Sequence, residues 1–307
     1  MRFRHLLLAV LVAFSAGITY AIVKIGVAHF PPVLFGAVRY MLVGVCLAAW
    51  WWVPEGRRRP VIGIAVSMTA QYILMFSSLS KSGDASSMAL VHQLYVAFAT
   101  IIAAVVYREA VGARRWIGMA VSFSGVIVIG FEPNVFHHLD AFFLAIAAAF
   151  AGGLCVVQAR RTAGISVLSL QFWVCLYGVL PMFLLTMATE EGQIDALLNP
   201  TWPAVLSVVF AGLFGAVLAQ AGRYYLVQRY PVSMVAPLML LTPVFAVLGG
   251  VVLLGDVITW RLLLGGILVI SGLGVIVLVP AGRVAASTTV GESVPGGQTT
   301  TNDKREI

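Results

Sequence analysis

Two polar residues in the middle of an apolar run, His92 and Gln93, are the strongest candidates in this chain for contact with a small molecule. At helical spacing Gln93 shares a face with small or hydroxylated residues, namely Ser86, Ala89, Ala97 and Thr100. Such a face lets a ligand approach the backbone, although small residues also permit close helix packing. His92 lies on the neighbouring face, where it could relay protons, bind a carboxylate or hydrogen-bond another helix.

Other amide, hydroxyl and phenol side chains stand inside apolar runs, several of them one helical turn apart. They are Ser15, Thr19, Tyr20, Gln71, Tyr95, Gln220 and Tyr224. An amino acid needs hydrogen bonds for its ammonium and carboxylate once they leave water, and neutral groups supply them without burying a full charge. Pro237 and Pro243 break a backbone ladder and free carbonyls, which helix packing or a ligand could satisfy. We predict that this set, with Pro237, lines a cavity, although contacts between helices would also explain it.

Charged residues are nearly absent from the apolar runs. Arg39 and Arg223 stand near predicted helix ends and could attract carboxylates, but we expect their long stems to carry the charge to the membrane interface. The 12 acidic residues fall in loops, at helix ends or in the tail. A carrier that exchanges protons for cations through a buried acid is therefore disfavoured. Because no metal-binding, nucleophile, phosphate-loop or paired-acid motif occurs, we predict no enzymatic activity, no cofactor and no metal.

The composition requires lipid as the solvent for these runs. The chain has 307 residues, of which 61% are hydrophobic and 10% charged, whereas soluble domains carry about 25% charged residues. At roughly 20 residues for each membrane-spanning helix, the apolar runs predict an all-α polytopic membrane protein with ten transmembrane helices. The predicted spans are 6–26, 33–53, 61–80, 85–106, 113–131, 140–158, 165–188, 203–226, 232–254 and 262–280.

The basic residues predict the orientation of the chain. Placing both termini in the cytoplasm puts most of the arginines on the inner side and leaves only Lys24, Lys81 and Arg261 outside. The net charge of +7 then reflects topology, and we expect no nucleic-acid partner.

The second half of the chain repeats the first. Residues 86–129 align without a gap with residues 233–276, so that Glu109 falls on Asp256, Gly118 on Gly265 and Gly125 on Gly272. Five spans per half invert the second copy relative to the first, as in many secondary transporters. We predict two inverted five-helix repeats over residues 1–132 and 138–280, and a disordered cytoplasmic tail over 281–307. The paired glycines predict packing faces that join the halves or form a dimer surface.

Several short segments resemble the EamA-type ten-helix members of the drug/metabolite transporter superfamily. They are Phe30-Pro31-Pro32 followed by Arg39-Tyr40, Val91-His92-Gln93-Leu94-Tyr95, Tyr107-Arg108-Glu109-Ala110-Val111, Val235-Ala236-Pro237-Leu238, Thr242-Pro243-Val244 and Gly255-Asp256. The likeness covers roughly residues 6–280, and the His-Gln segment is similar to that of bacterial cysteine and O-acetylserine exporters. Phe14-Ser15 departs from the Trp-Gly that the family often has, so the resemblance leaves the cargo open.

The resemblance implies a monomeric secondary transporter that exports amino acids or related small metabolites across a bacterial inner membrane by alternating access. His92 is the one proton carrier that we can name inside a span. Two alternatives remain open. One is a carrier of another solute, such as a nucleotide-sugar or drug-like compound, and the other is a membrane protein that binds lipid in the cavity without transport.

Overall fold

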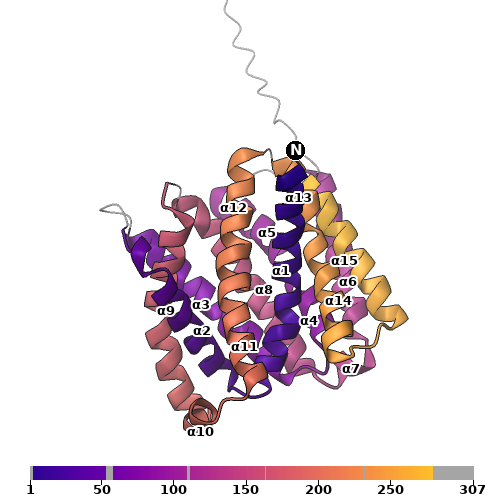
Figure 1. Cartoon of the computed structure of the whole chain (residues 1–307). Coiled ribbons are helices and arrows are strands. Elements are labelled where there is room, and N and C mark those ends of the chain that lie inside the picture. Colours follow the sequence, from indigo (N-terminus) through magenta and orange to yellow (C-terminus); the bar gives the residue numbers. More distant parts are fainter. Residues whose placement is uncertain (1–2, 53–57, 109–110, 163, 231, 279–307) are drawn as a thin grey trace, which may run out of the picture.

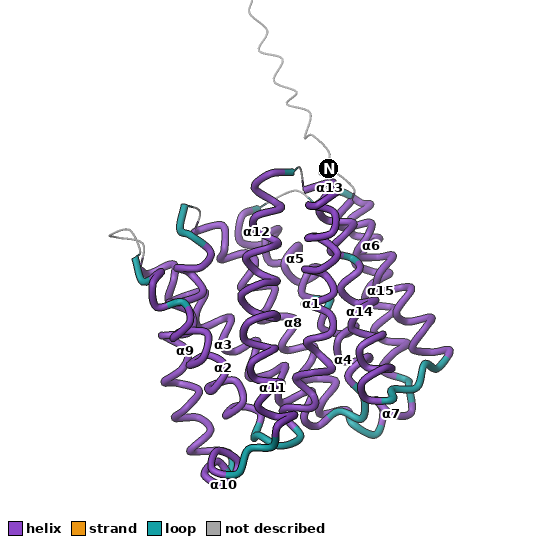
Figure 2. The backbone as a smooth tube through the Cα atoms, viewed as in Figure 1, coloured by secondary structure: helices purple, strands orange, loops and turns teal. Residues whose placement is uncertain are grey.

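The structure is a computed structural model, and it describes residues 3–52, 58–108, 111–162, 164–230 and 232–278. Those residues form a bundle of helices with no strand among them (Figures 1 and 2). The predicted tail, 281–307, and Glu109 lie outside the described residues. We call the end of the bundle that holds the N-terminus the N-side, and the opposite end the far side.

The first half of the bundle contains α1 (Phe3–Val27), α2 (Pro32–Cys46), η1 (Ala48–Trp50), α3 (Arg58–Lys81), α4 (Ala85–His92), α5 (Tyr95–Tyr107), α6 (Ala113–Gly130) and α7 (Pro133–Phe136). The second half contains α8 (Leu139–Ala159), η2 (Arg160–Thr162), α9 (Val167–Thr189), α10 (Gln193–Leu198), α11 (Trp202–Phe210), η3 (Ala211–Leu218), α12 (Ala219–Arg229), α13 (Val232–Met239), α14 (Leu241–Gly249), η4 (Gly250–Leu254) and α15 (Trp260–Leu278). Local sequence fixes several starts, since Pro32 opens α2, and the Asp84 and Ser166 side chains cap α4 and α9.

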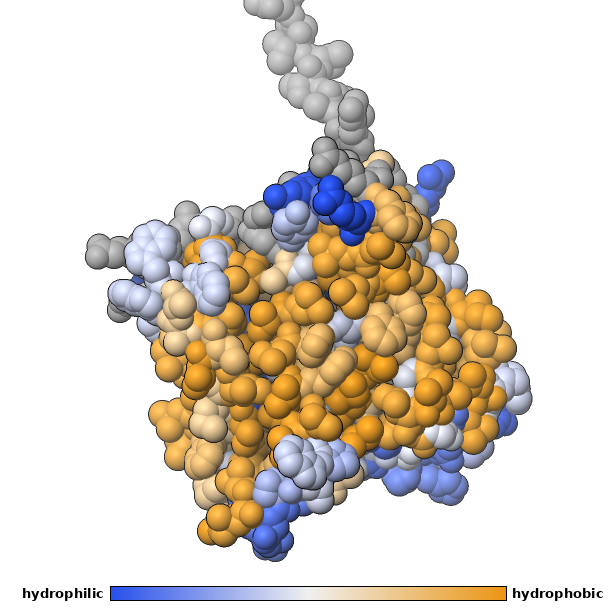
Figure 3. Space-filling view, viewed as in Figure 1, coloured by the Kyte–Doolittle hydropathy of each residue, from blue (hydrophilic) through white to orange (hydrophobic). Residues whose placement is uncertain are grey.

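The lengths of these helices fit a membrane. Within the described residues, eight helical segments are long and apolar enough to cross a bilayer, and two shorter apolar helices, Pro32–Cys46 and Leu241–Leu254, complete ten. Apolar side chains form a broad band across the face of the bundle seen in Figure 3, and hydrophilic residues gather at its two ends. The predicted all-α polytopic fold is therefore confirmed.

Three predicted spans differ from the observed helices. The second was expected to run from 33 to 53, but α2 ends at Cys46 and a short 3₁₀ turn follows. The fourth was expected to be continuous, but it breaks between His92 and Tyr95. The ninth breaks at the equivalent place, between Met239 and Leu241. The first interruption is local, because the N–H groups of Gln93, Leu94 and Val96 still donate to backbone carbonyls three residues earlier.

The two halves meet along α6 and α15, which cross as antiparallel partners. A Cβ on Gly125 would lie 2.7 Å from the Gly265 carbonyl oxygen, and one on Gly118 would lie 2.8 Å from that of Gly272. Ser122 donates a hydrogen bond to the Val269 carbonyl, and the two positions are 147 residues apart. That separation equals the offset between the repeats, so a pseudo-two-fold axis passes between equivalent residues. The glycines join the halves, which was one of the two alternatives above.

Three carboxylates connect the halves at the far side. Glu190 accepts hydrogen bonds from the backbone N–H groups of Val33 (2.9 Å) and Leu34 (3.1 Å) at the start of α2. Glu132 accepts one from the Thr259 hydroxyl at 2.6 Å. Each carboxylate belongs to one half and its donor to the other. A carboxylate at a helix N-terminus also satisfies donors that the helix leaves unpaired and interacts favourably with its dipole.

Asp256 makes the most extensive of these contacts. One of its carboxylate oxygens accepts hydrogen bonds from the backbone N–H groups of Ala85 (3.0 Å) and Ser86 (2.9 Å) and from the Ser86 hydroxyl (2.7 Å). Close by, the Lys24 ammonium donates to the Ser82 carbonyl at 2.7 Å. Burial raises the pKa of the neighbouring Asp84 carboxyl above its ordinary value. The far side is thus closed by a dense set of polar contacts between the halves.

Candidate functional site

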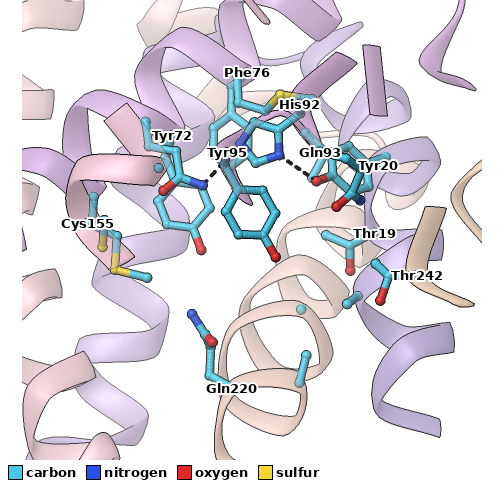
Figure 4. A pocket seen from close by; sticks show the side chains of 18 of the residues that line it. Thr19, Tyr20, Tyr72, Phe76, His92, Gln93, Tyr95, Cys155, Gln220 and Thr242 are labelled. Carbon is cyan, nitrogen blue, oxygen red and sulfur yellow. Dashed lines mark hydrogen bonds between the residues drawn. The ribbon is translucent and has the colours of Figure 1, made fainter. Parts of the chain in front are cut away.

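A cavity of about 240 Å³ lies inside the bundle and takes its walls from both halves. Its polar and aromatic lining comes from α1, α2, α3, α8, α12 and the interrupted helices α4–α5 and α13–α14 (Figure 4). The lining residues with polar or aromatic side chains are Thr19, Tyr20, Arg39, Gln71, Tyr72, Phe76, His92, Gln93, Tyr95, Cys155, Gln220, Arg223 and Thr242.

The walls of the cavity are buried toward the far side and more exposed toward the N-side. Its lining residues nearest the far side, Val23 and Leu79, are each 1% exposed. Arg223 and Val156, which line it nearer the N-side, are exposed. A small molecule could therefore enter from the N-side, while the far-side contacts block its exit.

His92 is held from both sides within the cavity wall. Its Nδ1 lies 2.8 Å from the Tyr20 hydroxyl oxygen, and its Nε2 lies 3.1 Å from Nε2 of Gln71 (Figure 4). An amide nitrogen can only donate, so in this arrangement His92 Nε2 accepts and Nδ1 carries the proton toward Tyr20. The Tyr95 ring lies beside the imidazole, with 5.7 Å between ring centroids. These contacts fix the imidazole plane and align Tyr20 and Gln71 along the cavity wall.

Replacing Tyr20 by phenylalanine tests this chain of hydrogen bonds. The change removes only the hydroxyl and leaves the buried His92 Nδ1 without its partner. We expect the free energy of unfolding to fall by about 0.5–1.5 kcal/mol, as for other hydrogen bonds between membrane helices. Thermal unfolding in detergent measures it, with Tyr225→Phe as the control because Tyr225 is exposed and its ring contact with Arg229 survives. An equal loss in both variants would contradict the assignment.

A stretch of π-helix, η3, supplies carbonyl groups to the first half of the chain. Ser15 Oγ donates to the Phe214 carbonyl at 2.8 Å, and Arg39 Nε donates to the Ala211 carbonyl at 3.0 Å. Both carbonyls belong to η3, where wider turns weaken the regular ladder, and such segments are frequent at functional sites. Gly215 lets α1 approach closely, since a Cβ there would lie 2.8 Å from Thr19 Oγ1. The wall of the cavity is therefore built by contacts between the halves.

Arg39 does not reach the membrane interface, and the expectation that it would is wrong. Its side chain is 2% exposed, lines the cavity and stacks over Tyr72 with 4.2 Å from the guanidinium carbon to the ring centroid. The physical reason is that the side chain turns into the bundle, where the guanidinium stacks on Tyr72 and Nε donates to the Ala211 carbonyl. Arg223 is exposed, as expected, and it hydrogen-bonds Gln220 at the mouth of the cavity.

Most of the predicted cavity residues lie together. The cavity is lined by Thr19, Tyr20, Gln71, His92, Gln93, Tyr95 and Gln220 from that set. Ser15 is buried outside it, against η3. Tyr224 lies in α12 and Pro237 in α13, but their side chains are outside the described residues. Tyr72 and Phe76 also line the cavity but were not predicted. They stand one helical turn apart on α3, next to Gln71, and this spacing could have indicated them.

Two curated proteins match nearly the full length of this chain. One is a probable amino-acid metabolite efflux pump of Salmonella typhimurium, 26% identical over 275 residues that cover 87% of this chain and 92% of that protein. The other has the same name in Escherichia coli K12 and is 25% identical over the same coverage. The uncharacterized inner membrane transporter YedA of Escherichia coli K12 is 24% identical over 84% of this chain and 87% of its own.

A solved crystal structure has the same fold, with a TM-score of 0.62, 20% identity, and coverage of 88% of this chain and 96% of the other. The profile of the EamA-like transporter family matches residues 4–131 and again residues 139–278. The two matches together span most of the bundle, and the short helix α7 lies in the gap between them. The interrupted helices, the cavity between the halves and this double match lead to one conclusion: the chain is a multi-pass membrane protein that belongs to the EamA-like transporter family.

Proposed function

We propose that this protein exports amino acids or closely related small metabolites across the bacterial inner membrane. The observation that carries the proposal is the cavity itself, which is enclosed by both halves and lined by amides, hydroxyls and phenols. Such groups replace the water around a zwitterion without adding an opposing full charge. The names of the Salmonella and Escherichia relatives agree with this cargo class.

Alternating access is the mechanism that we propose. The distribution of basic residues supports an N-terminus in the cytoplasm, and in that orientation a cavity open to the N-side would be an inward-open state. Rocking of the halves about the α6–α15 contact would separate Asp256 and Glu190 from their partners and open the far side. His92 stays our predicted proton carrier, because it is the imidazole that lies in the cavity wall. The chain is proposed to act as a monomer.

The size of the cavity favours small cargo over the larger alternatives. Sites for drug-sized ligands have volumes of about 300–1,000 Å³, and this cavity has about 240 Å³. A nucleotide-sugar would need more room than this state provides. A bound lipid would favour apolar walls, whereas Gln71, His92 and Gln93 face this cavity.

An export assay tests the proposal. Cells that overproduce the protein should tolerate toxic amounts of at least one amino acid or amino-acid precursor and accumulate it outside. The control is Gly152→Leu, because a Cβ at Gly152 already lies 3.2 Å from Gln71 Cδ and from Tyr95 Cβ, so leucine would fill the cavity. Equal tolerance and accumulation in cells with the wild-type protein, the Gly152→Leu variant and no protein, across all twenty amino acids, would refute it.

A further inference from the structure

The cavity contains a buried positive charge that no acidic residue balances. Arg39 is 2% exposed, and its Nη1 is buried without a hydrogen-bond partner. Its described contacts are neutral: Nε donates to the Ala211 carbonyl, and the guanidinium stacks on Tyr72. The lining of the cavity, among the residues that the structure describes, includes no aspartate or glutamate.

A charged side chain held this way inside a membrane protein is costly, and such residues usually pair with an opposite charge or serve a pathway. The Arg39 side chain does not bring its charge to water at the far side. The residue lies about 10 Å along α2 from Pro32, and Glu190 already accepts from the backbone at that end of the helix. Guanidinium groups bind carboxylates through two parallel hydrogen bonds, and here one nitrogen is unpaired.

We infer that Arg39 binds the carboxylate of the transported compound, so that the cavity selects molecules with a free carboxylate and excludes their amides and cationic analogues. The inference rests on the proposed function and names the group by which its cargo is recognised. Arg223, also positively charged, stands at the N-side mouth of the same cavity. Anions entering from that side would therefore pass one arginine before reaching the other.

The rest of the cavity fits the uncharged remainder of such a molecule. Tyr72 and Phe76 present aromatic surface next to Arg39, with the guanidinium carbon 5.7 Å from the Phe76 centroid. Gln71 and His92 stand on the same wall of the cavity as Tyr72. A cation would find aromatic faces and neutral dipoles but no carboxylate, and it would be repelled by Arg39.

Paired ligands test the inference on the purified full-length protein. The probes are the twenty proteinogenic amino acids, lactate and succinate, each compared with its own amide, and the readout is the midpoint of thermal unfolding over a range of probe concentrations. At least one acid should raise the unfolding midpoint of the wild-type protein. The affinity for its amide, obtained from the dependence of the midpoint on concentration, should be at least tenfold lower, and Arg39→Gln should lower the affinity for the acid at least tenfold. Arg39→Lys keeps the positive charge but loses the two parallel donors of the guanidinium, so its affinity for the acid should lie between those of the wild-type protein and Arg39→Gln.

Arg114→Gln is the matched control, because Arg114 is exposed at the start of α6, outside the cavity. If Arg39→Gln does not fold, the acid and amide comparison on wild type and Arg39→Lys decides instead. A purely structural Arg39 would lower the midpoint without ligand when it is replaced, yet leave the preference for acid over amide unchanged.

The outcomes separate this inference from the proposed function. Amino acids that bind as well as their amides, with no effect of Arg39→Gln, would overturn the role of Arg39 and leave amino-acid export standing. Binding of lactate or succinate alone, lost in Arg39→Gln, would support Arg39 and refute the amino-acid cargo. A panel in which no acid stabilises the wild-type protein more than its amide would overturn the inference.

Discussion

Replacing Gly125 by leucine is expected to prevent the two halves from packing and to remove most of the folded protein. A Cβ at this position would lie 2.7 Å from the Gly265 carbonyl oxygen and 2.8 Å from the Val269 nitrogen, which are both backbone atoms. Backbone on a packed helix cannot move aside cheaply, and overpacking typically costs about 1–3 kcal/mol even for smaller additions. The yield of monodisperse protein in size-exclusion chromatography should fall at least tenfold.

Gly112→Leu provides the comparison for this prediction. Gly112 precedes α6 in the same segment, has a negative φ of −63°, and a Cβ there meets no atom within 4 Å. This variant should be produced like the wild-type protein, since the added side chain enters open space. If Gly125→Leu also eluted as a folded, monodisperse protein, the close antiparallel contact between α6 and α15 would be wrong.

Replacing Asp256 by alanine is expected to open the far side of the cavity. The change removes the acceptor of the backbone N–H groups of Ala85 and Ser86, and leaves the Ser86 hydroxyl with a longer contact to the Val247 carbonyl at 3.5 Å. Buried donors left unpaired cost about 1–3 kcal/mol, and each 1.4 kcal/mol alters an equilibrium tenfold. Labelling of Leu79→Cys by a membrane-impermeant maleimide added outside whole cells should therefore become at least tenfold faster.

That experiment requires a background in which the three native cysteines are replaced by alanine. Asp195→Ala serves as the control, since Asp195 is an exposed far-side acid whose carboxylate accepts a hydrogen bond from the nearby Asn199 amide at 2.8 Å. It should leave the labelling rate unchanged. If Asp256→Ala lowered thermal stability but did not accelerate labelling, Asp256 would hold the fold together without controlling access.

The sequence predicts the fold well because its signals are periodic and redundant. Gly118 and Gly125 recur in the second half as Gly265 and Gly272, and small residues at helical spacing indicate close approach of two helices. The structure then pairs these glycines with one another. Cavity residues such as Gln71 and Gln93 could be predicted as well, because burying an amide in an apolar run is unfavourable unless the amide faces a cavity or a hydrogen-bond partner.

The site was less predictable where a helix end or a backbone irregularity decides it. The apolar tryptophans Trp50, Trp51 and Trp52 extend the second predicted span beyond the observed end at Cys46. Nothing in the sequence indicates that the Arg39 side chain turns inward onto Tyr72. The π-helical segment η3 contains no proline, and side-chain patterns carry no sign of its wider turns. Its carbonyl contacts with Ser15 and Arg39 depend on packing between the halves, which becomes visible only in three dimensions.

The pseudo-two-fold contact between α6 and α15 bears on how such a chain could have arisen. Gly118 meets Gly272 and Gly125 meets Gly265, so each contact is the image of the other under the repeat. A single ancestral half that inserted into the membrane in both directions would already possess this interface, because one helix is complementary to its own inverted copy. Duplication and fusion of its gene would then preserve this contact while the rest of each copy could change.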